Sequence, residues 1–124
     1  MKSRMFILMI AWVLTPITYA DDSVAINQLI SDINKAAKMN KARMLRIIVI
    51  NTDVSTSTLE QEKTRTGLSW GDIYVAHSLA MASNKSFNEI AALKAKGQSW
   101  STIAQANKVS LKGSTAALQQ MLKE

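Results

Sequence analysis

The 124-residue sequence contains no cysteine, one histidine and one proline. The absence of cysteine excludes a disulfide framework and a thiolate metal site. The single histidine, His77, has no ligand partner on its own helix face, because the preceding acid, Asp72, lies five residues earlier, and the other acids are scattered without ligand spacing. The sequence also lacks a nucleophile elbow and a Gly-rich phosphate loop. We therefore expect no enzymatic activity, no metal and no cofactor.

The first twenty residues, MKSRMFILMIAWVLTPITYA, have the pattern of a secretory signal peptide. Lys2 and Arg4 precede the apolar run 5–14, which is too short to span a bilayer, and small residues at Thr18 and Ala20 predict cleavage after Ala20. The alternatives are a buried N-terminal helix or a retained membrane anchor. Cleavage predicts a periplasmic or secreted chain with a net charge of +4, against +6 for the whole sequence.

One phrase occurs twice, as TGLSWGDIYVAHSLA over residues 66–80 and as KGQSWSTIAQANKVS over residues 96–110. The identical pairs are Gly67 and Gly97, Ser69 and Ser99, Trp70 and Trp100, Ile73 and Ile103, and Ala76 and Ala106. Glycine tolerates the left-handed backbone that ends a helix, and a serine two residues later can cap the next helix. Each phrase therefore predicts a helix end, a tight turn and a helix start, with tryptophan at the first helical position.

Apolar spacing predicts a helix that ends near Met39-Asn40, before the ambiguous stretch 41–51. The β-branched residues at 47–50 favour a strand over positions 43–50, whereas the spacing from Met44 to Ile48 favours a short buried helix. We expect a helix, because no second strand is visible to pair with a first.

Further capping patterns complete the predicted helices. Ser57 with Glu60 and Ser86 with Glu89 predict helices over 58–66 and 87–96, and a last helix follows Ser110. The predicted fold is all-α, a small bundle of five or six short helices containing two helix-turn-helix hairpin repeats. The predicted organisation is a signal peptide at 1–20, an N-terminal helical segment at 21–51 and a helical hairpin repeat domain at 52–124.

The segments GLSWGDIYVAHSLA and KSFNEIAALKAKGQSWSTIA are similar to short exported bacterial proteins of unknown function. These proteins carry a Gly-x-Ser/Gly-Trp/Tyr-Gly turn, a Lys-Ser-Phe helix start and a second Gly-x-Gly/Ser-Trp turn. The likeness covers roughly residues 54–111 and departs from the pattern at Ser101, where a glycine is common. The resemblance implies a location in the bacterial envelope and brings no activity with it.

Two partial resemblances offer alternatives. Residues 92–122 resemble the three-helix DNA-reading unit of resolvases, which implies a recognition helix over 111–122. That helix would present four polar side chains to base edges and has no arginine. The four are Lys112, Gln119, Gln120 and Lys123. Residues 97–111 resemble the central part of LysM modules, which bind N-acetylglucosamine polymers, although such modules need a strand on either side.

Two sets of residues are candidates for binding. The tryptophans Trp70 and Trp100 could form a stacking platform, but their place beside a tight turn favours a packing role in the helix joint. The second set is a basic cluster that comprises Lys38, Lys41, Arg43 and Arg46. These side chains could contact anionic lipid or wall polymer, or they could simply be solvated. We expect an exported non-enzymatic binding or structural protein whose partner is an envelope protein or an anionic surface, with nucleic acid as the alternative.

Overall fold

The computed structural model describes residues 23–124, which form seven helices and contain no strand. The all-α prediction is confirmed, and the signal-peptide prediction lies outside the described residues. The helices are an N-terminal helix at residues 23–39, α2 (Lys41–Thr52), α3 (Thr56–Thr66), α4 (Trp70–Ser83), α5 (Phe87–Ala95), α6 (Trp100–Ala106) and α7 (Lys112–Lys123). The described part has more helices than the five or six expected, because every predicted segment, the ambiguous stretch 41–51 included, forms a helix of its own.

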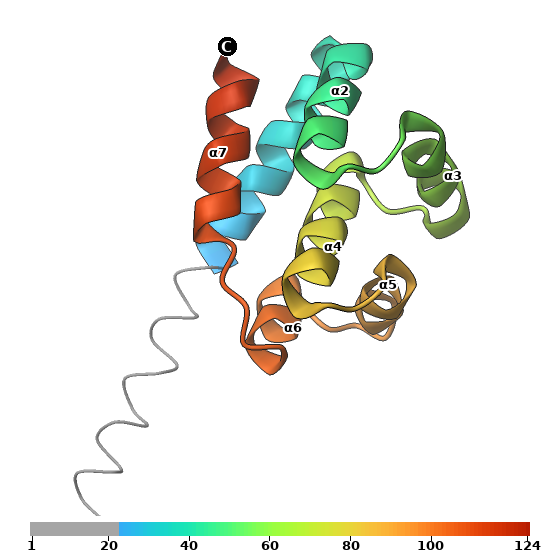
Figure 1. Cartoon of the computed structure of the whole chain (residues 1–124), viewed down its shortest axis with the longest axis vertical. Helices are drawn as coiled ribbons and strands as arrows, with labels where there is room; N and C mark the ends of the chain where they lie inside the picture. The colour runs from blue at the N-terminus through green and yellow to red at the C-terminus, as the bar shows by residue number, and fades with distance from the viewer. Residues whose placement is uncertain (1–22) are drawn as a thin grey trace, which may run out of the picture.

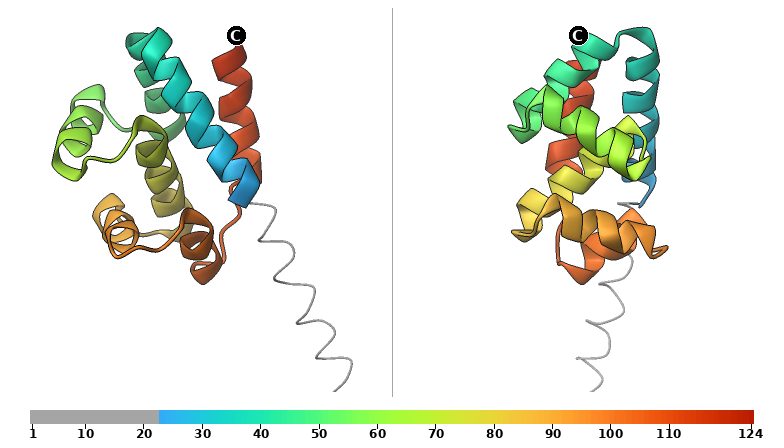
Figure 2. Two further views of the ribbon diagram at one scale, coloured as in Figure 1. Left: turned by 180° about the vertical axis from the view of Figure 1, so that it is seen from behind. Right: turned by 90° about the vertical axis from the view of Figure 1, so that its right-hand side faces the viewer.

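Helix α4 is the centre of the molecule. Every residue from Ile73 to Ala80 is buried, so the helix is covered on all sides. It contacts α2, α3, α5 and α6, and Figure 1 shows it in the middle, with α2 and α7 towards one end and α5 and α6 towards the other. Seen from behind in Figure 2, the N-terminal helix runs beside α7, where Gln119 Nε2 donates to Asp32 Oδ2 over 2.9 Å.

The ambiguous stretch 41–51 is helical, as expected. Asn40 caps α2 by accepting a hydrogen bond from the Arg43 backbone N–H at 3.1 Å. Met44, Leu45 and Ile48 lie in the core, which gives the helix one buried side. Burial of this side decides between helix and strand, since the local β-branched residues alone favour a strand.

Capping predictions for α3 and α5 have different outcomes. The capping box of Ser86 and Glu89 is confirmed. The prediction that Ser57 caps α3 is wrong, because Ser55 is the cap and accepts from the Thr58 backbone N–H at 3.2 Å. Ser55 has the extended backbone that an N-cap requires, whereas Ser57 is already inside the helix.

The two predicted turns share a left-handed glycine, although Gly67 directly follows α3 whereas Lys96 separates α5 from Gly97. Gly67 and Gly97 have φ values of 72° and 98°, in the left-handed region that glycine tolerates. Ser69 and Ser99 each accept a hydrogen bond at 3.1 Å from the backbone N–H three residues later. In both turns a tryptophan is the first helical residue. Each turn thus has a left-handed glycine followed two residues later by a capping serine, although α4 is twice as long as α6.

Candidate functional site

Trp100 is a packing residue. Its side chain is buried, with 4% of the residue exposed. The indole Nε1 donates to Asp72 Oδ1 over 2.8 Å, and Lys94 Nζ lies 5.1 Å from the ring centroid. The ring therefore joins the start of α6 to the start of α4. This burial argues against the predicted binding role for Trp100.

Trp70 has different surroundings, although it occupies the same position in its turn. The ring is half-buried, and the ammonium groups of Lys41 and Lys63 each lie 5.6 Å from its centroid. A depression of about 430 Å³ adjoins it, which we call the Trp70 hollow. The hollow is lined by Asn34, Ala37, Lys38, Lys63, Ser69 and Trp70.

Close packing of the N-terminal helix on α4 builds this hollow. A side-chain Cβ at Gly71 would lie 2.6 Å from the Ile30 carbonyl oxygen, so only glycine permits the observed approach. Asn34 Oδ1 accepts a hydrogen bond from the Gly71 N–H at 2.9 Å. Lys38 follows Asn34 by one helical turn and lies on the same face, so both residues line the hollow.

The hollow carries an excess of positive charge. Lys41 pairs with Glu60, with 2.7 Å between Nζ and Oε1, and both side chains are about half exposed. Within residues 23–124, no carboxylate pairs with Lys38 or Lys63. Three lysines face the single carboxylate of Glu60, so the group has a net positive charge. The exposed pair itself contributes at most about 1 kcal/mol, so it holds Lys41 only weakly.

The predicted basic cluster is therefore divided. Lys38 and Lys41 lie beside Trp70, but Arg43 donates to the Met121 and Leu122 carbonyl oxygens at 2.9 and 3.4 Å, at the C-terminal end of α7. Arg43 is thus a structural residue. Arg46 is exposed on α2 and does not line the hollow.

Lys63 is the site residue that the sequence pattern does not identify. It lies in the last turn of α3, where a basic residue is explained by the helix dipole alone. The turn at Gly67 reverses the chain and places Lys63 over Trp70, seven residues later. Only the path of the chain through this turn reveals the contact.

His77 is held inside the protein. Its Nε2 lies 2.6 Å from Glu62 Oε1, and both side chains are at most 10% exposed. The imidazole ring stacks on Phe87 with 4.4 Å between ring centroids. The residue joins α3, α4 and α5, and it does not line the Trp70 hollow.

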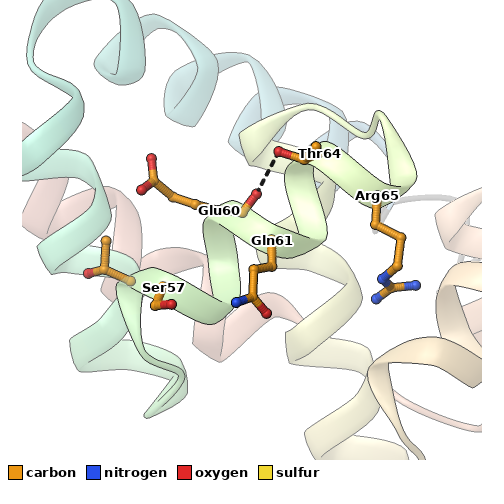
Figure 3. Close-up of a pocket in the computed structure, with 6 residues that line it drawn as sticks. Ser57, Glu60, Gln61, Thr64 and Arg65 are labelled. Carbon is orange, nitrogen blue, oxygen red and sulfur yellow. Dashed lines mark hydrogen bonds between the residues drawn. The ribbon is translucent and has the colours of Figure 1, made fainter.

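Two other surface hollows are weaker candidates. Figure 3 shows one over the outer face of α3, where all the lining residues come from a single helix and Thr64 Oγ1 donates to the Glu60 carbonyl oxygen. A single helix face cannot enclose a ligand. The other is a groove of about 530 Å³ between α3 and α5. Its lining contains no aromatic ring, and Arg65 already donates to Asn88 Oδ1 at 2.9 Å.

The described residues also contain no group of three or more acidic or histidine side chains placed to hold a metal ion. Among the helices of residues 23–124, none has both the length and the apolar character needed to cross a membrane. Comparison with protein-family models, curated proteins and solved structures gives no match to this chain.

The structure also bears on the two partial resemblances. Helix α7, in the place of a recognition helix, packs into the bundle with Leu118 fully buried and Gln119 bonded to Asp32. The strands that a LysM module needs beside its helices do not occur within residues 23–124. The three-helix order after residue 86 agrees with the first resemblance, and of the residues named for base contacts Gln120 and Lys123 remain exposed.

Proposed function

We propose that this protein is an exported, non-enzymatic binding protein of the bacterial envelope, and that the Trp70 hollow binds an anionic ligand. The observation that carries the proposal is the convergence of three lysines on a half-buried tryptophan. Lys38, Lys41 and Lys63 come from three different helices, and Glu60 is the one carboxylate paired with any of them in the described chain.

The tryptophan helps to place the cations. An ammonium group over an indole ring gains about 0.5–1 kcal/mol at an exposed site. This attraction holds Lys41 and Lys63 near the ring, which reduces the side-chain entropy that a ligand must otherwise remove. An anion entering the hollow can then form charge-assisted hydrogen bonds, which are stronger than bonds between neutral groups.

We further propose that the α3–α4 and α5–α6 hairpins are two copies of one unit. The shared glycine, serine and tryptophan positions support this proposal. In the second copy the tryptophan is part of the core, and in the first it remains at the surface.

The location rests on the sequence of residues 1–20. We expect the protein in the envelope or medium fraction, with Asp21 at its amino terminus after cleavage. Full-length protein in the cytoplasmic fraction would favour the nucleic-acid alternative. Cell fractionation with mass measurement distinguishes the two outcomes.

The double variant Lys38→Gln/Lys63→Gln is expected to weaken binding of poly-L-glutamate and of inorganic polyphosphate by about tenfold or more. The reason is the loss of two charged donors at the hollow. Isothermal titration at 0.15 M salt is suitable, because charges further than about 8 Å from the ligand are then screened.

The matched control is Lys85→Gln/Lys96→Gln, which removes the same charge at two exposed positions outside the hollow. We expect its affinity to remain within about threefold of wild type at this ionic strength. Equal losses in both double variants would indicate diffuse attraction rather than a site. Failure of the wild-type protein to bind either polymer would also contradict the proposal.

A further inference from the structure

The protein already contains one tryptophan that binds a carboxylate. Trp100 donates its indole N–H to Asp72 Oδ1 at 2.8 Å, while Lys94 lies over the ring. The second oxygen of the same carboxylate, Oδ2, accepts from the Ser69 hydroxyl at 2.9 Å. One carboxylate is thus bound by an indole N–H on one oxygen and by a second donor on the other.

Trp70 presents the same groups without the acceptor. It follows the same Gly-x-Ser turn, occupies the same helical position and has lysine ammonium groups over its ring. Among residues 23–124, no atom accepts a hydrogen bond from Trp70 Nε1, and this nitrogen is not sealed from solvent. The indole N–H of Trp70 is therefore open to a ligand from outside.

We infer that the Trp70 hollow binds a carboxylate side chain of an acidic peptide segment. One carboxylate oxygen accepts from Trp70 Nε1, and Lys63 or Lys38 donates to the other, as Ser69 does for Asp72. This inference rests on the proposed function, because it names the chemistry of the anion that the hollow takes.

The lining of the hollow favours a peptide as the source of the carboxylate. Asn34 uses its Oδ1 to accept from Gly71, and its Nδ2 donates to no other group within the described chain. That amide can donate to a peptide carbonyl oxygen. The acceptor of Trp100 is itself an aspartate side chain, so the protein shows that an amino-acid carboxylate fits this geometry.

The test uses the Trp70→Phe variant, which keeps an aromatic ring and removes the N–H. We expect its affinity for poly-L-glutamate to fall about tenfold and its affinity for inorganic polyphosphate to change by less than about threefold. Polyphosphate is the comparison anion: its oxygens can also accept from an indole N–H, so a loss confined to poly-L-glutamate shows that the donor is placed for a carboxylate. Titration calorimetry gives both affinities, and circular dichroism confirms that the variant is folded.

The matched control is Trp100→Phe, which removes the internal N–H and should leave both affinities within about threefold of wild type. Unchanged binding of poly-L-glutamate by Trp70→Phe, or an equal loss for both polymers, would overturn the carboxylate inference. Tighter wild-type binding of polygalacturonate than of poly-L-glutamate would overturn the peptide as the source. None of these outcomes affects the proposed function, which fails instead if the Lys38→Gln/Lys63→Gln variant binds like wild type.

Discussion

Replacing Gly71 with alanine is expected to lower the free energy of unfolding by about 3 kcal/mol, at the upper end of the usual cost of overpacking. The new Cβ would lie 2.6 Å from the Ile30 carbonyl oxygen and 2.7 Å from its Cα. These are backbone atoms, so no side-chain rotation relieves the clash. The N-terminal helix must move away from α4, which also breaks the hydrogen bond from Gly71 to Asn34.

The matched control is Gly113→Ala in α7, because a Cβ at Gly113 meets nothing within 4 Å. Alanine is a better helix former than glycine by about 0.5–1 kcal/mol, so this variant should be slightly more stable than wild type. Denaturant unfolding followed by circular dichroism measures both changes. A Gly71→Ala variant as stable as wild type would show that the two helices do not approach as closely as described.

Replacing Trp100 with alanine is expected to destabilise the protein by about 3–5 kcal/mol, the usual range for removing a buried aromatic side chain. The substitution leaves a cavity between α4 and α6. It also removes the partner of Asp72 Oδ1 and the ring beneath Lys94. Thermal unfolding should show a correspondingly large decrease in midpoint temperature.

The corresponding change at the other turn, Trp70→Ala, should cost only about 1–2 kcal/mol. Its ring is half-buried, and each lysine over it contributes about 0.5–1 kcal/mol. Comparing the two alanine variants distinguishes the core-packing role of Trp100 from the surface role of Trp70. Equal destabilisation by the two substitutions would mean that both tryptophans serve only the core.

The local features of the fold could be predicted from the sequence because neighbouring residues determine them. Gly67 and Gly97 end helices through a backbone conformation that glycine tolerates, and Ser69, Ser86 and Ser99 cap the following helices. The prediction of Ser57 in place of Ser55 is wrong because Glu60 lies three residues after Ser57, the spacing of a capping box, whereas Thr58 lies three residues after Ser55. Only the backbone leaving α2 shows which serine is extended.

The site could be predicted only in part, because long-range packing determines it. The repeated phrase gives no reason for Trp100 to be buried and Trp70 to remain at the surface. That difference depends on which helices cover each turn, as the contact between Asn34 and Gly71 illustrates. The structural role of Arg43 could not be predicted for the same reason, because its hydrogen-bond acceptors are the Met121 and Leu122 carbonyl oxygens near the other end of the sequence.

A difference between two otherwise similar turns thus becomes the main indication of function. In the second turn the indole N–H of Trp100 donates to Asp72, and Lys94 lies over a buried ring. In the first turn the indole N–H of Trp70 has no acceptor among residues 23–124, and lysines lie over a ring at the surface. A partly exposed indole offers another molecule both a flat apolar face and an N–H donor. The Trp70 hollow is the place where these groups coincide.

The most direct measurement is the change in tryptophan fluorescence when poly-L-glutamate is added to wild-type protein and to the Trp70→Phe variant. Subtracting the two titrations removes the contribution of Trp100, the other tryptophan that remains after the expected cleavage at Ala20. We predict a saturable change in the wild-type emission that the variant lacks. A change of the same size in both proteins, or in neither, would contradict a ligand site at Trp70.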